Sequence, residues 1–164
     1  AAPGAAQAGE LPIYAAAVSG DARVRDAIDQ ARAFAAGDLA VGDAIHRRGG
    51  AAGAAAREAP TPSAKAAAYA AEQASAVAHM AAHGLGAAGY AAKASALAAG
   101  VDGEEAARAE ARRQVDAMTD PVARALASLP VLGTSASGPL GPGRLCQGHV
   151  GQAIRAIQAD LARR

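Results

Sequence analysis

The sequence predicts an all-α fold, a compact alanine-rich bundle of about six to seven helices with an extended C-terminal segment. About a third of the 164 residues are alanine, the best helix former, whereas the β-branched and aromatic residues that strands favour are scarce. Apolar residues also recur at spacings of three and four, the period of an amphipathic helix. Nothing in this pattern indicates a β-sheet or a transmembrane span, and the length fits one domain with a buried core.

Short helices are predicted in the N-terminal part of the chain. Residues 11–18 form an apolar segment, and Asp21 precedes an amphipathic run that Gly37 ends. Asp38 is the predicted N-cap of a third helix, which ends near residues 49–50. The apolar face of the amphipathic run comprises Val24, Ala27, Ile28, Ala31 and Phe34.

The longest helical stretch is predicted for residues 63–99, after the breaker formed by residues 60–63. Glycines at positions 84, 86 and 89 either split this stretch into two helices or let a neighbouring helix approach closely, and we expect a kink near residue 84. The acidic residues that follow Gly100 predict the start of a helix that runs through Met118. Pro121 begins a shorter helix that ends near Leu129.

The sequence predicts two further segments after the bundle of residues 1–129. Residues 130–148 are rich in Pro, Gly and Ser and predict an extended linker. Residues 149–164 predict an amphipathic helix. Its apolar stripe must pack either on the bundle or on a second molecule, so a homo-oligomer through this helix is one alternative; the stripe comprises Val150, Ile154, Ile157 and Leu161.

Charge and composition exclude several classes of protein. The 16 Lys and Arg residues nearly balance the 15 Asp and Glu residues and are scattered, which tells against nucleic-acid binding. One Phe, three Tyr and no Trp offer few platforms for stacking bases. Cys146 is the single cysteine, and residues 1–8 lack the pattern of a signal peptide, so we expect a cytoplasmic protein. The abundance of Ala, Gly, Arg and Pro is typical of a GC-rich bacterial genome.

Two histidines carry the clearest chemical motif in the sequence. His79 and His83 are four residues apart, the spacing of two metal ligands on one helical face. Glu72 lies seven residues before His79 and would supply a third ligand for zinc or iron. In the alternative to a metal site, the two histidines are buried groups that hydrogen-bond to the backbone or to tyrosine. No nucleophile or substrate-fixing motif accompanies them, so the sequence favours a protein that is not an enzyme and predicts no catalytic residue and no resident cofactor.

Three other motifs have ordinary structural explanations. The glycines at 84, 86 and 89 spell G-x-G-x-x-G, but helix-forming alanines flank them, so we interpret them as close-packing residues. His46, Arg47 and Arg48 form a small basic cluster, which either meets an acidic partner or is a solvated helix end. Cys146 and His149 receive no role.

Two blocks of sequence support a family resemblance over residues 10–132. The first block comprises residues 21–28 (DARVRDAI), 31–34 (ARAF) and 37–42 (GDLAVG), and the second comprises Gln73 with residues 78–83 (AHMAAH) and 86–93 (GAAGYAAK). On these blocks the chain resembles the alanine-rich "putative immunity protein" family, immunity-five-like, of bacterial polymorphic-toxin systems. The chain has Phe34 where that family often has Trp, Val77 where it often has Thr, and Glu72 where it usually has a small residue. The resemblance therefore assigns no role to Glu72.

The resemblance implies a non-catalytic protein that binds and neutralises a cognate toxin. Interfaces of this kind are anchored by aromatic and arginine side chains. The candidate anchors and pocket residues are Arg23, Arg25, His46, Arg47, Arg48, Gln73 and Tyr90. Two alternatives stay open. The first is a helical pocket protein that binds a metal or small molecule at His79 and His83, either with or without enzymatic activity. The second is a structural module that self-associates through its last helix.

Overall fold

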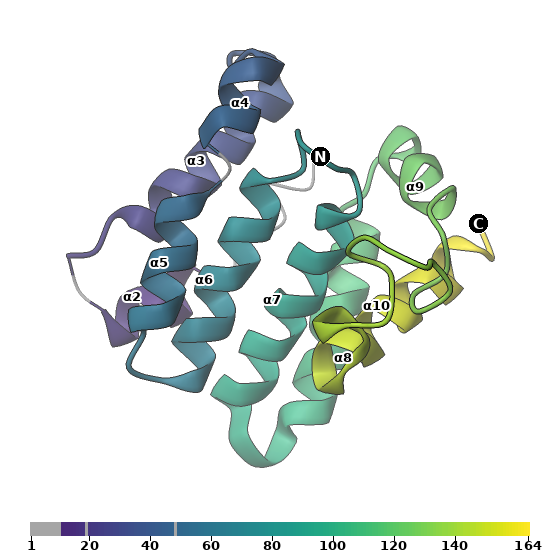
Figure 1. Cartoon of the computed structure of the whole chain (residues 1–164). Helices are drawn as coiled ribbons and strands as arrows, with labels where there is room; N and C mark the ends of the chain where they lie inside the picture. The colour runs from purple at the N-terminus through teal and green to yellow at the C-terminus, as the bar shows by residue number, and fades with distance from the viewer. Residues whose placement is uncertain (1–10, 19, 48) are drawn as a thin grey trace.

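The computed structural model describes residues 11–18, 20–47 and 49–164, and over these ranges it contains helices and no strand. The all-α prediction is confirmed, while the predictions for residues 1–8 and for Arg48 lie outside the described residues. Over the same ranges, seven α-helices have eight residues or more and two have seven (Figure 1). They are α2 (Leu11–Ala17), α3 (Arg23–Ala36), α4 (Val41–Arg47), α5 (Gly50–Glu58), α6 (Pro62–Ser75), α7 (His83–Ala99), α8 (Gly103–Asp116), α9 (Asp120–Ala127) and α10 (Gly148–Leu161).

Local sequence explains where several helices begin and end. Gly37 adopts a left-handed conformation with φ of 85°, which ends α3 as predicted. The backbone N–H of Asp38 donates to Ala33 O at 2.9 Å, so Asp38 belongs to the end of α3. Its prediction as the N-cap of the next helix is wrong, because α4 begins at Val41. The α6 start follows the sequence closely, since the Thr61 hydroxyl accepts from the backbone N–H of Ala64 at 3.2 Å.

The predicted stretch of residues 63–99 is two antiparallel helices, and the break precedes the expected kink near residue 84. Residues 76–82 form turns between α6 and α7. At the end of α6, the Ser75 hydroxyl donates to Glu72 O at 2.9 Å, and the Ala76 N–H donates both to that carbonyl and to Gln73 O, each at 3.2 Å. These competing bonds weaken the regular helical ladder without any glycine. The chain therefore reverses direction before His83.

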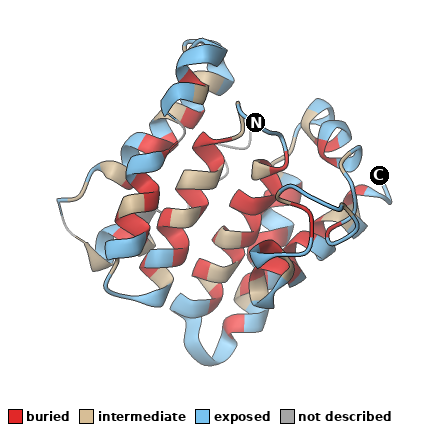
Figure 2. Ribbon diagram, in the orientation of Figure 1, coloured by how far each residue is buried: buried red, intermediate tan, exposed pale blue. Residues whose placement is uncertain are grey.

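Helices α6 and α7 lie in the middle of the bundle and join two hydrophobic clusters. One cluster includes residues of α2, α3, α5 and α6, and the other includes residues of α8, α9 and α10; α7 contributes to both. Figure 2 shows buried residues concentrated along α6 and α7. Close helix contact compensates for the small volume of alanine. A Cβ at Gly89 of α7 would lie 2.9 Å from Val150 Cγ1 and 3.0 Å from Ile154 Cγ1, which confirms close packing at this glycine.

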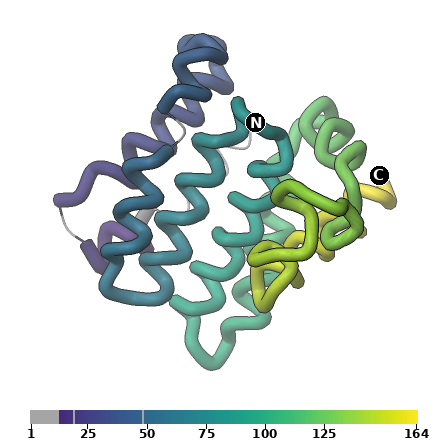
Figure 3. Tube along the Cα trace, in the orientation of Figure 1, coloured from purple at the N-terminus to yellow at the C-terminus, as the bar shows by residue number. Residues whose placement is uncertain are grey.

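The C-terminal part of the chain folds back onto the bundle. The apolar stripe of α10 is buried against α7 and α8, so this chain itself covers it. The preceding residues 130–147 form turns and bends with one short 3₁₀ helix (Arg144–Cys146), and Leu132, Leu140 and Leu145 are buried in the same cluster. The Gln158 side chain accepts from Leu132 N–H and donates to Pro130 O, both at 2.9 Å. The predicted linker is thus a packed loop against the bundle (Figure 3).

Within the described part of the chain, every helix is too short or too polar to cross a membrane.

Candidate functional site

A polar pocket of about 290 Å³ lies where the last turns of α6, the first turns of α7 and the C-terminal loop meet. It brings together four residues that the sequence singled out, Glu72, Gln73, His83 and Tyr90. The remaining lining residues are Tyr69 of α6 and Gly138, Pro139, Gly143, Arg144 and Leu145 of the loop. The pocket gathers polar side chains in a protein whose other helix contacts are mostly alanine.

Helical spacing and two glycines place the side chains of α6 in this pocket. Tyr69, Glu72 and Gln73 are separated by three and four residues, so they share one face of α6. A Cβ at Gly53 of α5 would lie 2.9 Å from Glu72 Cδ, and a Cβ at Gly86 of α7 would lie 3.2 Å from Gln73 Cδ. The absence of side chains at these glycines therefore makes room for the carboxyl and the amide.

Gln73 fixes the tautomer of His83 across the α6–α7 turn. His83 Nδ1 lies 2.9 Å from Gln73 Oε1. Because an amide oxygen can only accept, Nδ1 carries the proton and Nε2 presents a lone pair. Burial lowers the pKa of His83, with a smaller contribution from His79, so the ring is neutral at pH 7. His83 can therefore accept a hydrogen bond or bind a metal through Nε2.

Glu72 and the two tyrosines form the rest of the polar wall. Burial raises the pKa of the Glu72 carboxyl, although Arg57 opposes the shift. The rings of Tyr69 and Tyr90 have centroids 5.3 Å apart and planes tilted by 36°. Burial also raises the pKa of Tyr90, so its hydroxyl is protonated at neutral pH. The wall therefore combines a desolvated carboxyl with two aromatic rings.

The two histidines meet only part of the requirements of a metal site. His79 lies in the turn before α7 and is exposed, and its ring centroid is 6.1 Å from that of His83. The prediction of one shared helical face is wrong, because the helix is interrupted between them. Gln73 does give His83 a hydrogen-bond partner of the kind that orients metal-binding histidines. Among residues 11–18, 20–47 and 49–164, however, no three His, Cys, Asp or Glu side chains are grouped to hold a metal ion, so Glu72 does not complete a three-ligand set.

Arg23, a predicted anchor, is held in a network inside the chain. Its guanidinium donates to Asp21 at 2.8 to 3.1 Å and to Glu58 at 2.7 Å, and Tyr14 Oη donates to Asp21 Oδ2 at 2.7 Å. The hydrogen bonds from Arg23 and Tyr14 hold the pKa of Asp21 well below its ordinary value. Burial and the Asp21 acceptor raise the pKa of Tyr14 to about 12. Arg23 therefore joins α2, α3 and α5.

A second, larger cleft of about 710 Å³ lies between α3, α4 and α5. Arg47 lines it from α4, facing Asp26 of α3 and Asp38 of the connection that follows. These three side chains make no ion pair within the described part of the chain. Arg25 and His46 are exposed on the same two helices. The cleft thus presents charges of both signs that are free to meet another molecule.

Sequence reasoning missed two residues of the polar pocket. Tyr69 could have been found, because it lies three and four residues before Glu72 and Gln73 in a helical segment. Arg144 lies 54 residues after Tyr90 (144 − 90), at the start of a short 3₁₀ helix in the C-terminal loop, and no spacing rule links the two. Only the folded loop brings Arg144 to the pocket.

The fold and these two cavities define a small all-α bundle with clefts that are open to solvent. The model of the family described as "Imm-5 like putative immunity protein" matches residues 5–121, and the chain belongs to this family. The family match confirms the resemblance drawn from the two sequence blocks. It spans α2 to α8 and ends before the C-terminal loop and α10. No curated protein and no solved structure matches the chain.

Proposed function

We propose that this protein is an immunity protein that binds a cognate bacterial toxin and blocks it without catalysis. The observation that carries the proposal is the family match over residues 5–121, which includes both sequence blocks. A protein that acts by binding needs a surface with unsatisfied groups and does not need an assembled set of catalytic residues. The cleft between α3, α4 and α5 offers such a surface.

The α3–α4–α5 cleft is the docking surface we favour for the toxin. It is the larger of the two cavities described above, and it lies within the family match. Arg47, Asp26 and Asp38 leave charges of both signs exposed to solvent along it. Complementary charges accelerate association and select the partner. The first residue of α4 is Val41, an apolar side chain that is 56% exposed and available for contact.

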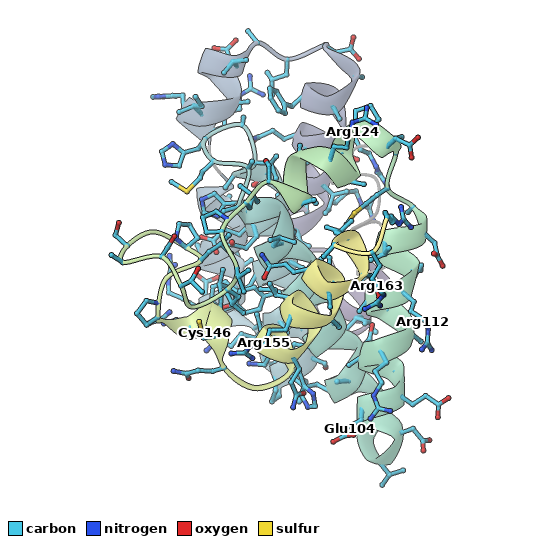
Figure 4. The ribbon with its side chains drawn as sticks, turned by 90° about the vertical axis from the view of Figure 1, so that its right-hand side faces the viewer. Glu104, Arg112, Arg124, Cys146, Arg155 and Arg163 are labelled. Atoms are coloured by element: carbon cyan, nitrogen blue, oxygen red, sulfur yellow. The ribbon has the colours of Figure 1, made fainter. Side chains whose placement is uncertain are left out.

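Co-expression with the toxin encoded beside this gene tests the proposal. We expect the wild-type chain to restore growth and to co-purify with the toxin. A double charge reversal, Arg47→Glu with Asp38→Lys, should weaken the complex by about tenfold or more, because like charges then meet across the interface. Arg112→Glu is the matched control, since Arg112 points outward on α8 at the other side of the bundle (Figure 4). Failure of the wild-type chain to bind or protect would refute the proposal.

A second function, binding of a metal or small molecule at the His79/His83 face, is favoured by the polar pocket itself. Gln73, His83 and Tyr90 meet there although the alanine core does not require them for volume. Elemental mass spectrometry of the untagged protein tests the metal version. Near-stoichiometric zinc or iron that is lost in the His79→Ala, His83→Ala double variant would support a metal site. Metal-free wild-type protein would leave only the small-molecule version.

A further inference from the structure

The charges at the polar pocket are unequal in their exposure to water. Glu72 is the one carboxyl among the described lining residues, and it is half-buried, whereas Arg144 is exposed at the rim. A half-buried charge is screened less by water and salt than an exposed one. Both charges act inside the pocket, since Arg144 lowers and Glu72 raises the pKa of Tyr90. The Glu72 carboxyl makes no hydrogen bond or ion pair with the described residues, and the charge of Arg57 offsets only part of its desolvation.

The neutral groups of the pocket are also suited to a positive charge. The tyrosine ring pair exposes aromatic surface, and the face of an aromatic ring attracts cations. The ring of His83 is held as the tautomer whose Nε2 accepts a hydrogen bond. A carboxyl, an imidazole lone pair and two aromatic rings together match a group that carries several N–H donors.

We infer that this pocket binds an organic cation, a guanidinium or alkylammonium group, between Glu72, His83 and the Tyr69–Tyr90 pair. The guanidinium is planar and can donate to the carboxyl and to Nε2 while it lies against an aromatic face. This inference is independent of toxin neutralisation, because a chain that protects against no toxin could still bind a cation at this site.

The C-terminal loop adjusts the selectivity of the site. Arg144 belongs to the loop that covers the pocket, and this loop lies outside the family match. Its positive charge at the rim repels a cation. A cation therefore binds only if its contacts with the other pocket residues offset this repulsion, which disfavours weakly held cations. Removal of this charge has opposite consequences for cationic and anionic ligands. Substitution of Arg144 therefore tests the sign of the charge that the pocket prefers in a ligand.

Titration of the full chain followed by NMR tests the inference. Chelator-treated, ¹⁵N-labelled protein is titrated with methylguanidinium and, as the uncharged isostere, with N-methylurea at constant ionic strength. We expect methylguanidinium to shift resonances around the pocket and N-methylurea to bind at least about tenfold more weakly, the ratio that a charge-assisted hydrogen bond provides. Glu72→Gln should weaken methylguanidinium about tenfold. Tyr90→Leu should also weaken it, by about threefold.

The matched controls separate the site from general charge effects. Glu105→Gln removes an exposed acidic charge on α8 and should leave the affinity unchanged. Arg144→Gln should strengthen methylguanidinium binding by about threefold, as expected for removal of one exposed like charge. Each variant is compared only if its spectrum shows the native fold. Equal binding of N-methylurea, unchanged affinity in Glu72→Gln, or weaker cation binding in Arg144→Gln would overturn the inference, whereas the toxin proposal would stand or fall on co-expression alone.

Discussion

The Asp21 network and the Glu72 pocket shift the pKa of a carboxyl in opposite directions. Asp21 accepts hydrogen bonds from Tyr14, from the Arg23 guanidinium and from the Arg23 backbone N–H, and its pKa is lowered. Glu72 is half-buried without such partners among the described residues, and its pKa is raised. Both carboxyls lie at helix contacts, Asp21 between α2 and α3 and Glu72 between α6 and α5. The fold satisfies the charge of the first carboxyl, whereas it supplies the second with no hydrogen bond from the described residues.

This difference separates structural residues from candidate functional ones. A charge that the chain itself compensates stabilises the fold, whereas an uncompensated charge costs free energy unless another molecule supplies the partner. Glu72 should therefore tolerate a neutral substitution that Asp21 does not. The three predictions that follow test this contrast, beginning with the largest expected effect.

Asp21→Asn should lower the free energy of unfolding by about 2 kcal/mol at pH 7, because hydrogen bonds to a charged acceptor are lost. The lowered pKa means that wild-type Asp21 contributes stability above its ordinary pKa of 3.8 and loses it as the pH falls further. The variant should lack this acid-dependent loss. Urea denaturation at pH 7 and at a series of acidic pH values measures both effects. Asp29→Asn is the control, since Asp29 forms an exposed pair with Arg32 that should contribute only a few tenths of a kcal/mol.

His83→Ala should destabilise the chain by about 1.5 kcal/mol, because Gln73 loses its partner in a half-buried position. His79→Ala should change stability by less than about 0.5 kcal/mol, because His79 is exposed. Thermal unfolding followed by circular dichroism compares the two variants. Equal effects would show that the two histidines act as one unit and would contradict the separate roles assigned here.

Glu72→Gln should stabilise the chain by about 1 kcal/mol at pH 7, the reverse of the Asp21 result, because it removes a desolvated charge. The raised pKa gives wild-type protein a stability that declines as the pH rises from the ordinary value of 4.5 through the higher folded value. The gap between wild type and variant should therefore close toward acidic pH. Urea denaturation at several pH values measures this gap. A destabilised variant at pH 7 would mean that Glu72 has a compensating partner after all.

Local patterns predicted elements well where one residue or one period controls the structure. Gly37 ends α3 and Thr61 precedes α6, because a left-handed turn and an N-cap are local choices of the backbone. The α6–α7 reversal was placed too late, because it depends on the competing bonds of Ser75 and on packing, and alanines flank it on both sides. Gln73 and His83 were named from the sequence, but their hydrogen bond requires that reversal.

The sequence by itself determined an all-α chain and its family, since alanine content, helical periodicity and two sequence blocks are properties of neighbouring residues. Tertiary structure alone decided that α10 covers the bundle, that Arg23 is held by Asp21 and Glu58, and that Arg144 reaches the rim of the pocket. These contacts join residues far apart in the chain. Their formation depends on which buried surfaces fit together, and no local spacing encodes that fit.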